Sequence, residues 1–394
     1  MSLDASAYEA VLQPVEHARG LPNACYTDAA VHSDEARHVF APSWAALAFG
    51  KDVPNPADAE PITFLGQPLL LVRGKDGTVR VFQNTCRHRG MILVQEPRQV
   101  RGVIRCPYHS WCYDLTGKLK TTPHVGGPGH NVHDAVDRDD LGLIEIRSHV
   151  WQDIVFVNLS GDAPPFEEHA RSLLERWAEF EQPAYFGGVE SAFELNVKTN
   201  WKLAVENYCE SYHLPWVHPG LNSYSRLEDH YNILEPSSFS GQGTMVYNPD
   251  LSQDQVFSNY PGLSDKWDRC AEYIALYPNV LLGVHRDHRF AIVLVPNGAG
   301  QTVERIALYY ASEEMLGDDY AELRAKNAAL WKGIFEEDIF VVEGMQAGRY
   351  GERFDGGKFS PVMDEATWAF HHWIALRMAA GAMEPSGSTA IAAQ

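Results

Sequence analysis

Two short loops that each carry one cysteine and one histidine constrain this chain of 394 residues more than any other feature. Cys86-Arg-His88 and Cys106-Pro-Tyr-His109 are separated only by residues 89–105. Two thiolates and two imidazoles on neighbouring loops can bind one metal centre. A zinc finger segregates its cysteines from its histidines, whereas each loop here carries one of each. The pattern therefore favours, over structural zinc, a two-iron centre with both thiolates on one iron and both imidazoles on the other.

Short strand patterns surround both loops. The stretch 62–84 reads as two strands joined by a turn at Lys75-Asp76-Gly77, and further strands are expected at 103–105, 111–114, 119–121, 143–147 and 154–159. Short strands with glycine turns are typical of a small β sandwich or barrel. We therefore expect a small all-β domain over residues 41–160, which ends at the Gly-Asp-Ala-Pro-Pro stretch 161–165.

Strand and helix patterns alternate in the rest of the chain. Helices are expected over 201–212, 320–346 and 364–380, with strands between the first two. Antiparallel strands covered by separate helices indicate an α+β domain, expected over 161–380. Residues 1–40 are expected to form a helical segment that packs on this larger domain, and the small, polar residues 381–394 a flexible tail.

The charge balance excludes several partners. Lys and Arg number 32 against 52 Asp and Glu, a formal net charge of −20, so neither nucleic acid nor a membrane surface is expected to bind. No apolar run is long enough to cross a bilayer, and the first residues lack a secretory signal. Six cysteines in so long a chain do not suggest a disulfide scaffold. We expect a cytoplasmic protein whose reduced thiols can bind metal.

A second group of possible metal ligands lies in His213-Leu-Pro-Trp-Val-His218-Pro219. On an ideal helix, residues five apart diverge by about 140° and would not share a metal. Pro215 and Pro219 break the helix, so the bent chain can bring both imidazoles together. A facial triad adds one carboxylate and leaves positions open for substrate and dioxygen. The expected helix 320–346 offers three neighbouring carboxylates: Glu336, Glu337 and Asp338.

The cysteine and histidine loops, with Trp111-Cys-Tyr-Asp-Leu-Thr-Gly117 after them, resemble the Rieske [2Fe–2S] motif of Rieske non-heme iron oxygenases, and most of the chain resembles their ring-hydroxylating alpha subunits. The family usually has a glycine where this chain has Ser110. The resemblance implies a Rieske domain and a larger catalytic domain of antiparallel sheet gripped by helices, as in START-like folds. It assigns the cluster ligands to Cys86, Cys106, His88 and His109.

The same resemblance assigns the mononuclear iron ligands to His213, His218 and Asp338, with Glu336 and Glu337 as the local competitors of Asp338. It implies that Glu210 bridges a Rieske histidine of one subunit to a ligand histidine of the next, although most ring-hydroxylating members carry Asp there. Asn207 is expected to lie near the iron.

The resemblance also implies partners. No Rossmann or flavin motif is present, so electrons from NAD(P)H must arrive through a separate reductase, with or without a ferredoxin. A homotrimer is expected, with or without a β subunit. The chain is then a terminal oxygenase that uses dioxygen to hydroxylate or demethylate a small organic molecule. The alternative of another class is a Rieske electron carrier whose mononuclear site is vestigial.

The substrate is less constrained. Glu210 and Tyr212-His213-Leu-Pro resemble the carnitine, betaine and choline oxygenase branch, whose quaternary amines are attracted to aromatic faces. The aromatic candidates are Tyr208, Tyr212, Trp216, Tyr224 and Tyr231. The alternative is an aromatic ring or aromatic acid, and Arg226 or Arg286 could then bind the carboxylate.

Overall fold

The computed structural model describes residues 3–251 and 255–383. The chain divides into two compact units: Leu47–Gly161 forms one, and Met1–Ala46 with Asp162–Gln394 forms the other. The α+β fold class is confirmed, because an all-β unit accompanies a larger unit of antiparallel sheet and helices. Most of the tail expected at 381–394 lies outside the described residues, and the last helix continues to Met383. No helix in the described ranges is both long and apolar enough to cross a membrane.

The smaller unit contains two sheets. The larger sheet has the strand order β1-β10-β9-β4-β3-β2-β5, and the other has the order β6-β7-β8. Their bounds are β1 Ala45–Phe49, β2 Asp58–Phe64, β3 Gln67–Arg73, β4 Val79–Gln83, β5 Arg98–Gln99, β6 Ile104–Arg105, β7 Cys112–Tyr113, β8 Leu119–Thr121, β9 Glu145–Trp151 and β10 Ile154–Asn158.

The sequence analysis did not predict one turn of this unit. The turn at Gly77, where φ is 79°, joins β3 and β4 as expected. The stretch 62–84 was expected to hold two strands, but β2 and β3 already meet in a hairpin at Leu65 and Gly66, where φ is 50° and 78°. Leucine rarely adopts a left-handed conformation, so this turn left little signal in the sequence.

The two cysteines lie in the core of the smaller unit. Cys86 and Cys106 are buried together with Phe82, Ile104 and Trp111, whose side chains belong to one apolar cluster. The strands before each loop therefore anchor it in the core, and the histidine that follows each cysteine lies nearer the surface.

The larger unit is built on an antiparallel sheet with the order β11-β18-β17-β16-β15-β14-β13, in which β12 also pairs with β18. The bounds are β11 Tyr185–Phe186, β12 Ala192–Val197, β13 His230–Glu235, β14 Phe239–Thr244, β15 Ala271–Leu276, β16 Val280–Val284, β17 His288–Pro296 and β18 Thr302–Tyr310. β14 to β16 are buried along their whole length, because helices cover the sheet.

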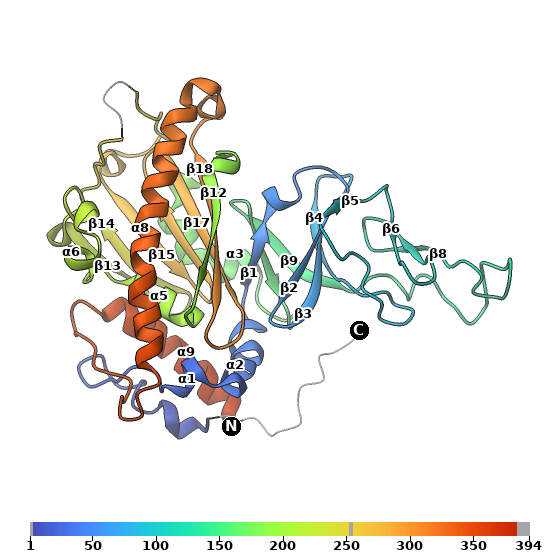
Figure 1. Cartoon of the computed structure of the whole chain (residues 1–394), viewed down its shortest axis with the longest axis horizontal. Coiled ribbons are helices and arrows are strands. Elements are labelled where there is room, and N and C mark those ends of the chain that lie inside the picture. The colour runs from blue at the N-terminus through green and yellow to red at the C-terminus, as the bar shows by residue number, and fades with distance from the viewer. Residues whose placement is uncertain (1–2, 252–254, 384–394) are drawn as a thin grey trace. The chain divides into compact units, whose positions relative to one another are not determined.

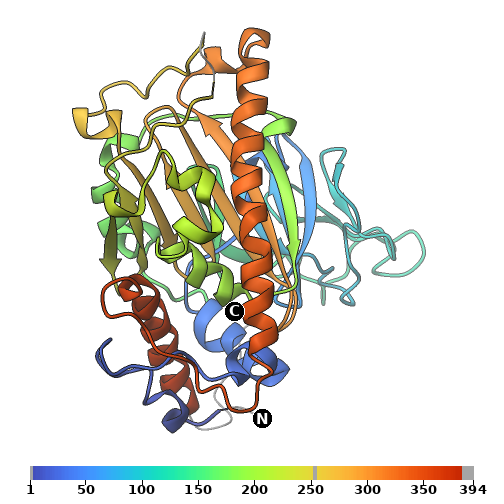
Figure 2. The same ribbon diagram turned by 60° about the vertical axis from the view of Figure 1, so that its left-hand side comes forward.

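Long helices cover this sheet. α8 runs across it as the longest helix, and α1, α2 and α9 lie together at one end (Figures 1 and 2). The bounds are α1 Ala24–Thr27, α2 Ala29–Glu35, α3 Phe166–His169, α4 Arg171–Arg176, α5 Trp201–Cys209, α6 Leu214–Val217, α7 Pro219–Asn222, α8 Ala321–Gly348 and α9 Glu365–Met383. The helix expected over 201–212 ends three residues early, at Cys209, so Glu210 already has an extended backbone.

Candidate functional site

Three side chains of the larger unit converge as metal ligands could. One ligand atom each from His213, His218 and Asp338 lies within 4.8 Å of the others. Asp338 Oδ1 is 2.9 Å from His218 Nε2 and 3.8 Å from His213 Nε2. This buried oxygen has no hydrogen-bond partner among the described residues. An unbonded carboxylate oxygen facing two imidazole nitrogens is a donor set that fits a mononuclear iron.

Helix ends position the two histidines. His213 is the residue before α6, and His218 lies between α6 and α7. Pro215 and Pro219 each occupy a first turn, where proline is tolerated, and they prevent one continuous helix. The two imidazole centroids are consequently 5.0 Å apart. The sequence argument that the bent chain brings both rings together is confirmed by this geometry.

A carboxylate holds the outer nitrogen of each histidine. His213 Nδ1 lies 2.6 Å from Glu210 Oε1, and His218 Nδ1 lies 2.7 Å from Glu337 Oε2. A proton shared with the carboxylate at Nδ1 leaves the Nε2 lone pair free to bind a metal. Burial opposes protonation, but Asp338 and Glu337 still raise the pKa of His218 above its ordinary value. The site is thus a focus of negative potential.

The three consecutive carboxylates at 336–338 in α8 have different positions in this geometry. Asp338 faces both histidines, whereas Glu337 contacts the far side of the His218 ring. Glu336 faces away, 3.7 Å from Lys332. The sequence analysis weighed Glu337 only as a competing ligand and missed its hydrogen bond to His218, because that contact joins residues 119 apart in the chain.

A pocket with a volume of about 450 Å³ adjoins the ligand atoms of His213, His218 and Asp338, and we call it the metal-adjacent pocket. Asn207, a buried residue of α5, lines it together with His213, His218 and Asp338. Aromatic rings form much of its wall: Tyr208, Tyr273, Phe290, Trp331 and Phe335. Phe290 and Trp331 are in contact, with centroids 4.5 Å apart. The pocket is therefore apolar except near the ligand atoms.

The aromatic residues proposed from sequence have different positions. Tyr208 lines the pocket, and its hydroxyl donates to the Leu282 carbonyl at 2.8 Å. Trp216 and Tyr212 are 71% and 44% exposed and do not line it. Tyr231 instead donates to Glu272, and Tyr224 packs beside Tyr247 outside the lining set. Tyr273, Phe290, Trp331 and Phe335 were missed, because buried aromatics in strands and helices look like ordinary core.

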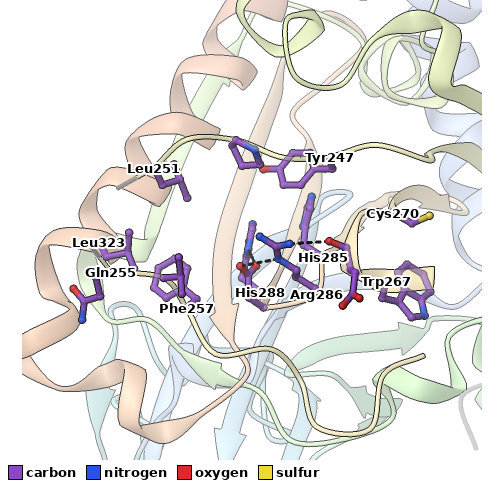
Figure 3. A pocket seen from close by; sticks show the side chains of 14 residues that line it. Tyr247, Leu251, Gln255, Phe257, Trp267, Cys270, His285, Arg286, His288 and Leu323 are labelled. Atoms are coloured by element: carbon purple, nitrogen blue, oxygen red, sulfur yellow. Dashed lines mark hydrogen bonds and ion pairs between the residues drawn. The ribbon is translucent and has the colours of Figure 1, made fainter. Parts of the chain in front are cut away.

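Neither proposed arginine reaches this pocket. Arg226 is exposed and lies 3.6 Å from Asp229. Arg286 lines a separate pocket beside His285 and His288, where its guanidinium donates to the Asp268 carbonyl at 2.7 Å (Figure 3). Among the described residues that line the metal-adjacent pocket, none is a lysine or arginine.

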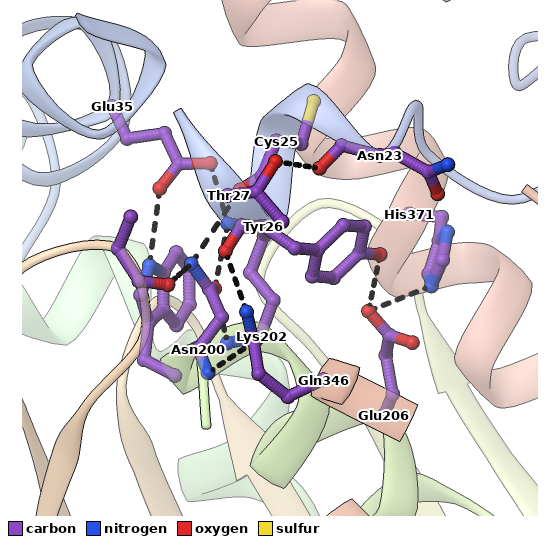
Figure 4. Close-up of polar contacts among 12 residues, drawn as sticks. Asn23, Cys25, Tyr26, Thr27, Glu35, Asn200, Lys202, Glu206, Gln346 and His371 are labelled. Atoms are coloured by element: carbon purple, nitrogen blue, oxygen red, sulfur yellow. Dashed lines mark hydrogen bonds and ion pairs between the residues drawn. The ribbon is translucent and has the colours of Figure 1, made fainter. Parts of the chain in front are cut away.

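A buried polar network ties α5 to the N-terminal segment (Figure 4). Lys202 Nζ lies 2.6 Å from Glu35 Oε1, with both side chains fully buried. Tyr26 donates to Glu206 Oε1 at 2.6 Å, and His371 Nε2 lies 3.1 Å from the same oxygen. Gln346 of α8 bonds the backbone of both Tyr26 and Asn200. The network thereby holds together the helices that carry Asn207 and Asp338.

The cysteine and histidine loops of the smaller unit have matching backbones. Cys86 N donates to Met91 O and Gly90 N to Cys86 O; Cys106 N likewise donates to Trp111 O and Ser110 N to Cys106 O. Gly90 and Ser110 follow their cysteines by four residues and have φ of 72° and 58°. Ser110 therefore occupies the left-handed position that glycine fills in the first loop.

The side chains of these loops fit a two-iron cluster. Cys86 and Cys106 are buried free thiols, and burial raises the pKa of Cys86, as does the neighbouring Cys106 thiol. The Tyr113 hydroxyl lies 3.3 Å from Cys86 Sγ, and this contact offsets only part of the rise in the pKa of Cys86. The rings of His88 and His109 are 4.8 Å apart, and His109 Nδ1 is buried with no hydrogen-bond partner in the described chain. Two thiols and two imidazoles thus converge in this unit.

Comparisons with known proteins match both units of the chain to known families. Residues 174–380 match the family described as ring hydroxylating alpha subunit (catalytic domain), and residues 43–134 match the Rieske [2Fe-2S] domain. The chain is 25% identical over 344 residues to the carnitine monooxygenase oxygenase subunit of Acinetobacter pittii, covering 85% of this chain and 86% of that one. It is 25% identical over 366 residues to the chloroplastic choline monooxygenase of Spinacia oleracea, covering 92% and 79%.

A solved structure shows the same fold. The quaternary ammonium Rieske monooxygenase CntA, in complex with its substrate L-carnitine, matches with a TM-score of 0.74 at 22% identity. The match covers 96% of this chain and 99% of that chain. At this identity the likeness concerns the fold alone.

Proposed function

Since the chain belongs to the ring hydroxylating alpha subunit family, and is therefore an oxygenase with a Rieske [2Fe–2S] cluster and a mononuclear iron, we propose that it acts on a small quaternary amine. The observation that carries this proposal is the pocket beside His213, His218 and Asp338. Its described lining combines aromatic faces with a carboxylate and includes no lysine or arginine. Aromatic faces attract a quaternary nitrogen, which needs no hydrogen-bond donor from the protein.

The ligand roles form part of the proposal. His213 and His218 bind the mononuclear iron through Nε2 and Asp338 through a carboxylate oxygen, while Cys86, Cys106, His88 and His109 bind the cluster. When bound, the cluster supplies single electrons and the iron activates dioxygen. Glu210 and Glu337 keep the two imidazoles in the tautomer that binds metal. Asn207 and the aromatic wall position the substrate carbon and exclude bulk water.

The partners follow from the family. A terminal oxygenase of this kind needs a reductase, and we propose that NAD(P)H electrons reach the cluster through that protein, with or without a ferredoxin. We propose a homotrimer, with or without a β subunit, in which Glu210 connects the cluster of one protomer to His213 of its neighbour. Glu210 is suited to this role because it already bonds His213. A cytoplasmic location remains the prediction made from the cysteine content.

Two alternatives can be weighed against the geometry. A substrate carboxylate, in an aromatic acid as in L-carnitine or glycine betaine, would have to find a cationic partner outside the described lining, so this feature does not separate the two classes. An electron carrier with a vestigial iron site would not need to retain three convergent ligand atoms and two carboxylates bonded behind them. The retained ligand geometry favours an oxygenase, and a lining of aromatic faces without lysine or arginine favours a cationic group on its substrate.

A substrate screen tests the proposal. Purified protein with a surrogate reductase and NADH is supplied in turn with choline, L-carnitine, glycine betaine and aromatic acids, while oxygen uptake and product are measured. We expect uptake and product with a quaternary amine. Uptake only with aromatic acids would contradict the substrate class. Metal analysis distinguishes the electron carrier, because an oxygenase holds about three irons per chain and a carrier about two.

A further inference from the structure

Glu304 is an acidic residue at a buried position of a β-strand, where apolar residues are usual. It lies on β18, whose buried residues Thr302 and Ile306 share its face of the strand. Arg305 points to the opposite face and pairs with Glu194 at 3.0 Å. Only 9% of Glu304 is exposed. Alternation along the strand therefore directs this side chain toward the helices that cover the sheet.

No described side chain is bonded to this carboxyl. Within residues 3–251 and 255–383, the side chain of Glu304 forms no hydrogen bond and no ion pair, while its backbone belongs to the sheet. Burial, with a further contribution from Asp338, raises its pKa to about 8. A buried carboxyl that lacks a partner is costly, so packing does not explain its presence. The carboxyl lacks a positive neighbour that would stabilise its ionised form.

Glu304 lines a further pocket, which Asp338 also lines and which shares part of its lining with the metal-adjacent pocket. Its other lining residues are mostly apolar: Val197, Ala204, Leu281, Ile292, Ile339 and Val342. Four residues line both pockets: Asn207, Tyr208, Phe335 and Asp338. No lysine or arginine occurs among the described residues that line either pocket. A cation entering this space would meet the buried Glu304 carboxyl, the proposed iron ligand Asp338 and the rings of Tyr208 and Phe335.

We propose that Glu304 is a specificity-determining residue that pairs with the cationic nitrogen of the substrate in the space shared by the two pockets. This inference rests on the proposed function and names the group that recognises its substrate class. A quaternary nitrogen donates no hydrogen bond, so the attraction is Coulombic, and the bound cation itself supplies the positive neighbour that favours the ionised carboxylate. Tyr208 and Phe335 add aromatic faces to the same nitrogen.

The test compares a cation with its neutral isostere. The probes are the quaternary amine that the wild-type enzyme oxidises and the tert-butyl analogue in which carbon replaces nitrogen. Binding of both to the holoenzyme is measured by calorimetry, and turnover separately. Glu304→Gln preserves shape and removes the charge, and we expect it to reduce the preference for the cation by at least about tenfold. Glu304→Asp should restore part of that preference.

Controls separate charge recognition from other roles. Glu194→Gln removes an exposed carboxylate near the same strand and should leave the preference unchanged. An unchanged preference in Glu304→Gln overturns the inference, and so does an equal loss of affinity for both probes, which indicates a structural role. Slower turnover with unaltered binding of the cation also overturns it, because the carboxyl then acts in the reaction. If wild-type enzyme oxidises no quaternary amine, the proposed function itself fails.

Discussion

Glu337 Oε2 lies 2.7 Å from Nδ1 of His218, on the side of the imidazole opposite to Asp338. Two adjacent residues of α8 therefore contact the two nitrogens of one imidazole: Glu337 contacts Nδ1 and Asp338 contacts Nε2. Successive helix residues diverge by about 100°, so the helix must approach His218 closely for both carboxylates to reach it. Glu337 and Asp338 together fix the orientation of the His218 ring relative to α8.

Glu337→Gln should weaken mononuclear iron binding by about 10- to 100-fold, because the amide no longer fixes the His218 tautomer as a carboxylate does. Competition with a chelator, followed by iron analysis, measures this change. Glu336→Gln is the matched control on the neighbouring residue, which faces Lys332. Equal iron affinity in both variants would contradict the role of Glu337.

Asp338→Ala should abolish the mononuclear iron and the oxygenase activity while the visible Rieske absorbance persists, because the cluster ligands lie in the other unit. Iron per chain and the visible spectrum check the two parts separately. Full activity in this variant would show that the ligand assignment is wrong.

Glu210→Gln should leave both metal centres in place at saturating iron yet slow turnover strongly, because electron transfer between protomers passes through this side chain in our proposal. The measurement is the rate at which the reduced cluster reoxidises in the presence of substrate and dioxygen. Glu235→Gln, an exchange on β13 outside both pockets, is the control. Normal reoxidation in Glu210→Gln would remove its bridging role.

Ser110→Gly should stabilise the smaller unit by up to about 1 kcal/mol, because a left-handed serine is strained and glycine is not. Gly90→Ser makes the reverse change at the equivalent position of the other loop, where a Cβ would meet nothing within 4 Å. It should destabilise by a similar amount through the backbone alone. Thermal loss of the visible cluster absorbance measures both, and shifts of the same sign would contradict the equivalence of the two loops.

Glu206→Gln should lower the free energy of unfolding of the larger unit by about 3 kcal/mol at neutral pH, because it breaks a buried charged network. Burial opposes ionisation, but His371 and Arg349 bring the pKa of Glu206 below its ordinary value of 4.5. A carboxyl with a lowered folded-state pKa stabilises at pH above its ordinary value, and this contribution is lost as pH falls through the folded value. Denaturant unfolding should therefore show a difference from wild type that shrinks below pH 4.5.

Residue types and their spacing, together with the family resemblance that they carry, predicted the metal chemistry and the class of fold. Cysteines and histidines at short spacing, and prolines after His213 and His218, are local features. They therefore make Cys86, His88, Cys106, His109, His213 and His218 candidate ligands without reference to any long-range contact.

The folded arrangement was needed to find the contact of Glu337 with His218, the left-handed Leu65 turn and the aromatic wall of the pocket. These features depend on contacts between residues distant in the chain, or on a backbone conformation that the residue type does not reveal. The uncompensated carboxyl of Glu304 belongs to the same group, because an acidic residue in a strand becomes unusual only once the helices that bury it are in place.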